Sequence, residues 1–311
     1  MFYRDDSDTH YDIGAAKSLV PTLPAGTYRF EMTMMGPSFK PQEQASDRYV
    51  PVPAPEMELV RQEFAEFFAA DVRARMAQYG QLNKRGILLY GPPGTGKTRL
   101  MLRIMEEAAA AHDAVILNGV RPNGDLTQAV DAIRRNDPTR NIIVLWDELD
   151  QMTARYETHL LRWLDGVDSV DNILFVGCTN HIAKIPSRIY ARPSRFGLVQ
   201  YIGPVNDEAR LAFVTGMYPE ITEVNATELV ALTSGQSLDA TKEVALLHVV
   251  RGHSPKLIAQ RLQTLNQHLT EAGVELGKDH PAAQPSTLQG LLNSMVAAAV
   301  AKHQDDDDDD E

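Results

Sequence analysis

The chain has 311 residues, enough for about two domains with a sizeable core. Its apolar share of 43% and charged share of 23% are typical of a globular protein, and no apolar run approaches the ~20 residues of a membrane span. The net charge of −12 argues against a body that coats nucleic acid, and seven of the negative charges lie in residues 305–311.

The first residues lack the basic-then-apolar pattern of a signal peptide. Cys178 is the only cysteine, so no internal disulfide can form, and a reducing, cytoplasmic location fits. Cys178 stands in an apolar stretch, which predicts an unreactive core thiol.

The N-terminal region, residues 1–56, is predicted to be an arm and a proline-rich linker. Within it, only Thr27 to Met35 partly alternates in polarity and favours one strand. Gly36 to Pro55 contains five prolines and indicates the linker. Met57 to Met76 then has apolar residues at three- and four-residue steps, which predicts an amphipathic helix.

A glycine-rich turn stands between a predicted strand, Ile87 to Tyr90, and a predicted helix, Arg99 to Ala111. The turn reads Gly-Pro-Pro-Gly-Thr-Gly-Lys-Thr, which is the nucleotide-binding P-loop in its required context. Its glycines let backbone N–H groups point at a polyphosphate, and the helix adds its positive end. Lys97 is expected to reach the β- and γ-phosphates, and the Thr98 hydroxyl to bind Mg²⁺. The predicted nucleotide-binding residues are Gly91, Pro92, Pro93, Gly94, Thr95, Gly96, Lys97, Thr98 and Arg99.

Three further apolar strands are predicted, at residues 114–118, 141–146 and 172–178. Because they alternate with helices, the sequence predicts a parallel, doubly wound sheet. Ligands bind such sheets beyond the carboxyl ends of the strands, where the P-loop, Asp147, Glu148 and Asn180 all stand. We expect Asp147 to hold Mg²⁺ and Glu148 to polarise the water that attacks the γ-phosphate.

Helical signals dominate the rest of the chain. Asp125 is predicted to cap a short helix, Asn225 to Glu228 to form a capping box, and Ser254 to be an N-cap. The helices expected after Asn206 cover residues 208–215, 226–232, 238–250, 255–272 and 286–303, and the acidic run 305–311 is expected to be disordered.

These motifs in their order resemble the AAA family of P-loop ATPases. The P-loop and Leu-Trp-Asp-Glu-Leu-Asp150 are similar to the paired nucleotide motifs of the family, and Phe175 to Asn180 is similar to its sensor-1 strand. Three further stretches resemble the Leu-Leu…Asp-Gly helix, the second region of homology and the start of the lid motif: Leu160 to Gly166, Ile185 to Phe196 and Thr233 to Ser237.

The resemblance implies an α/β P-loop (Rossmann-like) doubly wound parallel sheet with a small C-terminal all-helical lid domain. It implies ATP and Mg²⁺ as ligands and assigns Asn180 to orienting the attacking water. It places Arg192 and Arg195 at arginine-finger positions, which act on the nucleotide of the neighbouring subunit and imply a homo-oligomeric ring, usually a hexamer. The alternative is that both arginines make surface ion pairs, and Arg188 is expected to be structural.

The predicted division of the chain follows from these motifs. An α/β nucleotide-binding domain covers residues 57–205, and a helical lid covers 206–275. A linker with a C-terminal helix at 276–304 and an acidic tail at 305–311 complete the chain.

Several features depart from the family pattern. Ser237 to Ala240 lacks the glycine that normally approaches the adenine, and only Lys242 is a candidate near the sensor-2 position. The Gly119–Gly124 loop lacks the aromatic-apolar-Gly trio of polypeptide-threading motors, so Val120 and Arg121 either line a pore or form an ordinary connection.

By resemblance, the expected function is that of an ATPase that remodels or disassembles a protein complex. Two alternatives are a DNA-metabolism accessory ATPase, such as a helicase or clamp loader, and a nucleotide-gated assembly scaffold. The expected partners are further copies of the chain and a protein substrate; the charge does not support nucleic acid, and no membrane is implied.

Overall fold

The computed structural model describes residues 2–4, 11–12, 18–20, 22–34, 36–42, 50, 52, 55–166, 170–261 and 264. The chain divides into two compact units. The first comprises Met1–Asp47 with Ala54–Gly203, and the second Arg48–Pro53 with Pro204–Glu311. The helix expected at 286–303 and the acidic tail lie outside the described residues. None of the helices that the structure describes has the length and apolar character needed to cross a bilayer.

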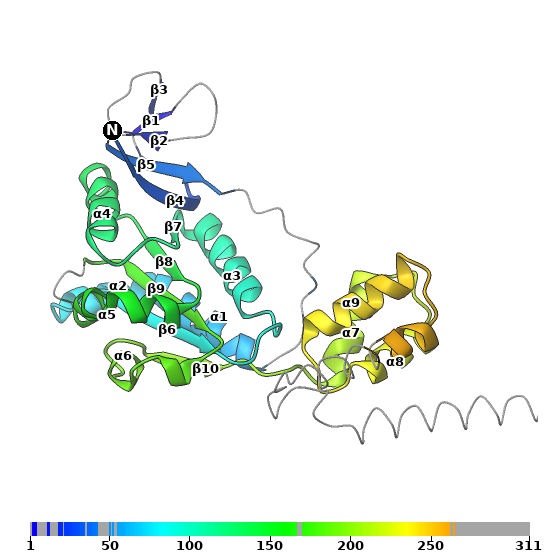
Figure 1. Cartoon of the computed structure of the whole chain (residues 1–311). Helices are drawn as coiled ribbons and strands as arrows, with labels where there is room; N and C mark the ends of the chain where they lie inside the picture. The colour runs from blue at the N-terminus through cyan, green and yellow to red at the C-terminus, as the bar shows by residue number, and fades with distance from the viewer. Residues whose placement is uncertain are drawn as a thin grey trace, which may run out of the picture. The chain divides into compact units, whose positions relative to one another are not determined.

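The first unit is built on one sheet whose described strands follow the order β10-β6-β9-β8-β7-β4-β5-β2-β1-β3 (Figure 1). All neighbouring pairs from β10 to β4 are parallel, which confirms the predicted fold class. The strands are β1 (Phe2–Arg4), β2 (Tyr11–Asp12), β3 (Ser18–Val20), β4 (Gly26–Thr33), β5 (Gly36–Pro41), β6 (Lys84–Tyr90), β7 (Val115–Asn118), β8 (Ile142–Trp146), β9 (Ile173–Thr179) and β10 (Leu198–Tyr201).

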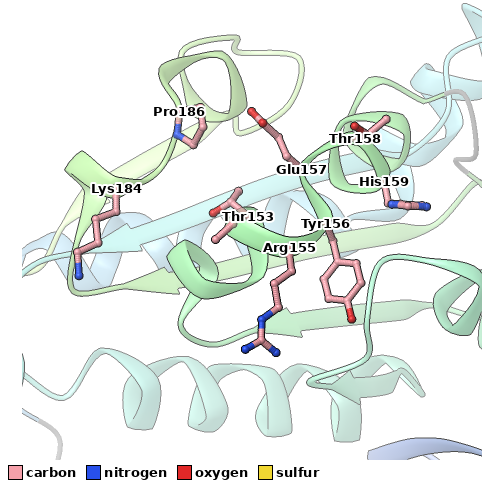
Figure 2. A pocket seen from close by; sticks show the side chains of 9 residues that line it. Thr153, Arg155, Tyr156, Glu157, Thr158, His159, Lys184 and Pro186 are labelled. Atoms are coloured by element: carbon pink, nitrogen blue, oxygen red, sulfur yellow. The ribbon is translucent and has the colours of Figure 1, made fainter.

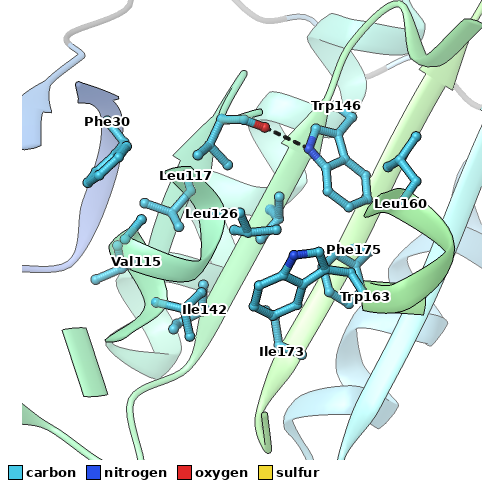
Figure 3. Packing of buried hydrophobic residues seen from close by; sticks show 14 of the residues in the cluster. Phe30, Val115, Leu117, Leu126, Ile142, Trp146, Leu160, Trp163, Ile173 and Phe175 are labelled. Atoms are coloured by element: carbon cyan, nitrogen blue, oxygen red, sulfur yellow. Dashed lines mark hydrogen bonds between the residues drawn. The ribbon is translucent and has the colours of Figure 1, made fainter. Parts of the chain in front are cut away.

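The central strands are apolar throughout because both faces of the sheet are covered. On β8, for example, Val144 packs in one core cluster and Ile143 in the other. The first cluster includes residues of α4 (Gly124–Asn136) and α5 (Leu149–Asp165), and the second includes residues of α1 (Pro55–Phe68) and α3 (Lys97–His112). Trp146 and Trp163 both pack on Phe175 in the first cluster (Figure 3).

Two local predictions about helices were wrong. The helix expected from Met57 to Met76 is interrupted at Ala69, whose ψ of 125° is extended, and α2 (Ala70–Gln78) follows. The cap of α4 is Asn123, whose side chain accepts a hydrogen bond from the N–H of Asp125. The Asx side chain two positions earlier therefore takes the role expected of Asp125.

The described strands of the N-terminal region, β1 to β5, belong to the same sheet as β6. β4 pairs in parallel with β7, and β5 pairs antiparallel with β4, so the linker predicted from Gly36 was wrong for its first six residues. The prolines of β5 are tolerated because β2 pairs only with Ser38 and Phe39, between Pro37 and Pro41.

The second unit is helical in its described part, as expected for the lid. It contains α7 (Asp207–Met217), α8 (Glu223–Leu232), α9 (Leu238–Val249) and helical residues 255–261, which share a core around Val214 and Leu229. Thr222 caps α8 by accepting a bond from the N–H of Asn225, so the capping box expected at Asn225 was wrong. The expected cap at Ser254 is present, since its Oγ accepts from the N–H of Leu257.

Candidate nucleotide-binding site

The P-loop joins β6 to α3 at the carboxyl edge of the sheet. Gly91, Gly94 and Gly96 have φ values of 154°, 75° and 85°, which L side chains rarely adopt. A Cβ on Gly91 would lie 2.1 Å from the carbonyl oxygen of Ile202, so the loop also needs glycine for close approach. The predicted loop residues Pro92, Pro93 and Thr95 fill the turn, with Thr95 buried and Pro93 exposed.

The Lys97 ammonium lies inside this loop. Its Nζ donates hydrogen bonds to the carbonyls of Gly91 at 2.9 Å and Pro92 at 2.6 Å, and the side chain is 5% exposed. A buried cation held among backbone dipoles is a ready partner for an anion entering the loop. The expected contact Arg99 is half-buried on the first turn of α3.

Thr98 and Asp147 meet across the edge of the sheet. The Thr98 Oγ1 lies 3.2 Å from each carboxylate oxygen of Asp147, which stands directly after β8. A hydroxyl and a carboxylate are the hard oxygen ligands that Mg²⁺ uses beside phosphates. The structure thus brings together the two residues expected to hold the metal.

Glu148 has a backbone conformation unusual for its type. Its φ of 52° and ψ of 48° are left-handed, and it occupies the N-cap position of α5. Its exposed side chain accepts a hydrogen bond at 2.8 Å from the Gln151 Nε2. Left-handed backbone in a non-glycine residue costs about 1–2 kcal/mol, a strain that recurs at functional sites.

The end of β9 lies beside the P-loop. Thr179 is in register with Tyr90, and the Thr179 carbonyl accepts from the N–H of Gly91 at 3.3 Å. Asn180, the expected sensor, follows directly and is exposed. His181, the next residue, is exposed as well.

The two expected arginine fingers differ sharply in environment. Arg192 is exposed, whereas Arg195 is only 5% exposed and binds both carboxylate oxygens of Asp165, at 2.5 and 2.7 Å. The Arg195 guanidinium holds the pKa of the Asp165 carboxyl below its ordinary value. Arg188, expected to be structural, pairs with Glu157 at 2.6 Å. The geometry therefore favours Arg192 over Arg195 for contact with another subunit.

The family comparison agrees with this arrangement. The family model for the ATPase family associated with various cellular activities (AAA) matches residues 87–204, which run from β6 past β10. The chain contains an AAA ATPase domain. An AAA domain implies ATP hydrolysis, and AAA ATPases bind ATP with Mg²⁺.

Similar proteins share this AAA domain over about two hundred residues. The chain is 28% identical to an "AAA ATPase forming ring-shaped complexes" of Bifidobacterium animalis subsp. lactis, over 56% of this chain and 37% of that protein. It is 28% identical to a "Proteasome-activating nucleotidase" of Methanoregula boonei, over 58% and 46%. It is 27% identical to a "Cell division cycle protein 48 homolog" of Archaeoglobus fulgidus, over 56% and 26%. The match spans less than half the length of each of these relatives.

The loop between β7 and α4 of the AAA domain does not present Val120. That side chain is 3% exposed, and the Val120 carbonyl accepts a hydrogen bond from the Trp146 Nε1 at 2.9 Å (Figure 3, dashed line). Of the two residues considered for a pore, only Arg121 is exposed, and it pairs with Asp125 at 2.5 Å. Val120 therefore belongs to an ordinary, packed connection.

Several residues of the site lacked a sequence signal. The Thr179 hydroxyl donates to Asp150 at 2.7 Å, and Asp165 binds Arg195, although each pair is about thirty residues apart. In the lid unit, the fully buried Arg210 binds the Gln236 carbonyl and, at 2.8 Å, the Thr241 Oγ1. The sequence shows only the residue types here, an arginine, an aspartate or a threonine, and neither their burial nor their partners can be predicted from it.

A polar cavity of about 350 Å³ lies where α5 is kinked at Tyr156, whose φ of −130° is not helical. Figure 2 shows Glu157 pointing to the opposite side from Arg155 and Tyr156. Because the polar side chains around the kink do not converge on one point, this cavity lacks the arrangement of a substrate site.

Proposed function

We propose that this chain binds Mg-ATP at Gly91–Thr98 and hydrolyses it within a homo-oligomeric ring, and that the ring uses this energy to remodel or disassemble a protein complex. The observation that carries the proposal is the meeting of Thr98 and Asp147, at 3.2 Å, beside a P-loop that already encloses the Lys97 ammonium.

The residues of the loop fit a magnesium-bound triphosphate. The positive φ values of the loop glycines allow backbone N–H groups to turn towards a polyphosphate, and Lys97 can exchange its carbonyl partners for phosphate oxygens. Thr98 and Asp147 would hold the metal, directly or through water, and the metal supplies charge neutralisation at the β- and γ-phosphates.

The remaining residues divide the chemical work. Glu148 would accept the proton of the attacking water, and Asn180 would orient that water from the neighbouring strand end. Arg192 would approach the γ-phosphate of the neighbouring subunit, where a guanidinium stabilises the charge that builds up on the equatorial oxygens. Arg195 would hold Arg192 in position from within the same subunit.

The ring and the remodelling role rest on the relatives. One is named as forming ring-shaped complexes and another as activating a proteasome, which supports an oligomer that acts on proteins. The hexameric copy number and the cytoplasmic location remain predictions. The location rests on the single, buried Cys178, whose thiol pKa is raised by burial.

Three variants test the hydrolytic site. Glu148→Gln should keep ATP binding and lower kcat by about 10²–10⁴-fold, because a general base is lost. Lys97→Ala should lose binding of a fluorescent ATP analogue. Glu157→Gln, which lies outside the site and changes the partner of the exposed Arg188, should match the wild type in both assays. Near-normal turnover by Glu148→Gln would contradict the assignment of the base.

Mixed oligomers test whether Arg192 acts in trans. Neither Arg192→Ala nor Glu148→Gln should turn over ATP efficiently alone. Mixtures should recover activity, because an intact Glu148 can then face an intact Arg192 from a neighbour. Native mass spectrometry gives the copy number. If no mixing ratio restored activity, the proposal that Arg192 acts on the neighbouring subunit's nucleotide would be contradicted.

The Glu148→Gln protein also identifies the substrate class. Held in ATP, it should retain a protein partner that mass spectrometry can identify after gentle purification. Stimulation of the wild-type ATPase by DNA, lost at high salt, would instead favour the DNA-accessory alternative.

A further inference from the structure

We propose that Asp165 and Arg195 are positioning residues that hold Arg192 in place for the nucleotide of the neighbouring subunit. The inference rests on the proposed function, since it assumes that Arg192 acts in trans. It assigns the second arginine of the Arg-Pro-Ser-Arg segment a role different from that of the first.

Arg192 starts a tight turn that Arg195 closes. The Arg192 carbonyl accepts hydrogen bonds from the N–H groups of Arg195 at 2.9 Å and Phe196 at 3.3 Å. The side chain of Arg192 is exposed, while the side chains of Arg195 and Phe196 are buried at 5% and 2% exposure. The turn thus points one arginine outward and anchors itself with the next two buried side chains.

Two partners, Asp165 and the carbonyl of Arg188, fix the buried Arg195 guanidinium. Both carboxylate oxygens of Asp165 accept from the Arg195 guanidinium, and the Arg195 Nη1 also donates to the carbonyl of Arg188. A planar guanidinium bound at three points loses its freedom to rotate. The position of the turn is therefore set by the end of α5.

The turn is also pressed onto the strand that leads to the P-loop. The Gly86 carbonyl accepts from the N–H of Gly197 at 2.9 Å. A Cβ on Gly86 would lie only 2.0 Å from the carbonyl oxygen of Arg195. Lys84, at the start of the same strand, donates to the Leu164 carbonyl beside Asp165. The arginine turn is held between β6 and α5.

These contacts connect two functions along one helix. α5 follows Glu148, the expected base of the subunit's own site, and ends at Asp165, which holds the segment that serves the next site. A shift of Arg195 by an ångström would move Arg192 similarly, and misplacement on that scale is enough to impair a catalytic group.

The chain offers a matched control on the same helix. Glu157 and Arg188 form a second two-point ion pair, with both N–O distances at 2.6 Å. That arginine side chain is 63% exposed, against 5% for Arg195. Exposed pairs contribute little to fixing a structure, so Glu157→Gln should leave activity within about twofold of the wild type.

The test is steady-state kinetics on the full chain. Asp165→Asn should lower kcat by about tenfold or more, with the KM for ATP and the binding of a fluorescent ATP analogue within about twofold. Arg195→Lys, which keeps the charge but not the planar fork, should give an intermediate fall in kcat. Should Asp165→Asn fail to fold, Arg195→Lys carries the test alone.

Mixing separates this inference from the proposed function. Subunits with Asp165→Asn keep Glu148, so adding Glu148→Gln subunits, whose Arg192 is correctly held, should restore turnover. Equal loss of nucleotide affinity and kcat, or full kcat, would overturn the positioning role. A wild-type chain that does not hydrolyse ATP would instead refute the proposed function itself.

Discussion

The Thr179 hydroxyl donates a 2.7 Å hydrogen bond to the Asp150 carboxylate, which ties the end of β9 to the first turn of α5. The Thr179 Oγ1 in turn accepts from the N–H of His181 at 2.9 Å. Glu148 and Asn180, the two residues expected to handle the attacking water, flank this bond. The bond therefore links the two segments that carry the expected base and the expected sensor.

Thr179→Val should separate these two residues without changing the volume of the side chain. We expect kcat to fall by about tenfold with little change in KM, because the lost contact positions groups and does not bind the nucleotide. The free energy of unfolding should fall by about 1 kcal/mol, since the part-buried hydrogen bond to Asp150 is lost. Thr179→Ser, which keeps the hydroxyl, should behave like the wild type in both assays. Equal kcat in the two variants would contradict the coupling.

The pH dependence of stability should report the Asp165–Arg195 pair. The pKa of Asp165 is lowered in the folded protein, so the pair stabilises the fold above the unfolded value of about 3.9 and loses this effect as the pH falls through the folded value. Asp165→Asn should melt about 2–4 °C below the wild type at pH 7, and the gap should close towards pH 3. Calorimetry at both pH values measures this difference in melting temperature. A difference that grows as the pH falls would contradict a stabilising contribution from the ionised Asp165.

Much of the fold was readable because its signals are local. Each of the four central strands contains a continuous apolar run, and the P-loop needs only neighbouring residues to define it. β10 was missed because its four residues, Leu198 to Tyr201, become a strand only by pairing with β6. The hairpin of β4 and β5 was hidden by its prolines, whose positions are harmless only in the observed register.

Part of the candidate site could also be predicted from local sequence signals. Lys97, Thr98 and Asp147 belong to short motifs, whereas the distinction between Arg192 and Arg195 depends on a carboxylate thirty residues away. The family resemblance gives both arginines the same role. Burial distinguishes the two residues. The Arg195 guanidinium is 5% exposed and donates to both oxygens of Asp165, so it is already bound within its own chain.

Arg210 should be essential to the lid unit. It is fully buried and holds the carbonyls of Gln236 and Ser237 at the start of α9. Arg210→Met should remove the donor of the Gln236 carbonyl, whereas the Ser237 carbonyl keeps the N–H of Thr241, and should lower the local free energy of unfolding by about 1–3 kcal/mol. Hydrogen exchange of residues 207–249 measures this, with the exposed Arg251→Met as control, expected within about 0.5 kcal/mol. Unchanged protection would show that the buried guanidinium is dispensable.

Gly86→Ala tests the contact between the P-loop strand and the arginine turn by steric pressure alone. Gly86 is buried in β6, and an added Cβ would meet the Arg195 carbonyl oxygen at 2.0 Å and the Phe196 ring at 3.1 Å. Backbone atoms cannot yield as a flexible side chain can, so the turn must shift. We expect a loss of about 1–3 kcal/mol in the free energy of unfolding, together with a fall in kcat larger than any change in ATP affinity.

The matched control for this change is Gly124→Ala. There the nearest atom to an added Cβ is the Gln128 Nε2 at 3.9 Å, and the residue is the first of α4. Alanine at such a position should leave turnover unchanged and either preserve stability or raise it by about 0.4–1 kcal/mol, because it restricts the unfolded chain. Urea titration measures the stability of both variants, and steady-state kinetics measures their kcat. If Gly86→Ala lost stability as expected but kept full kcat, the arginine turn would be packed on β6 without being positioned by it.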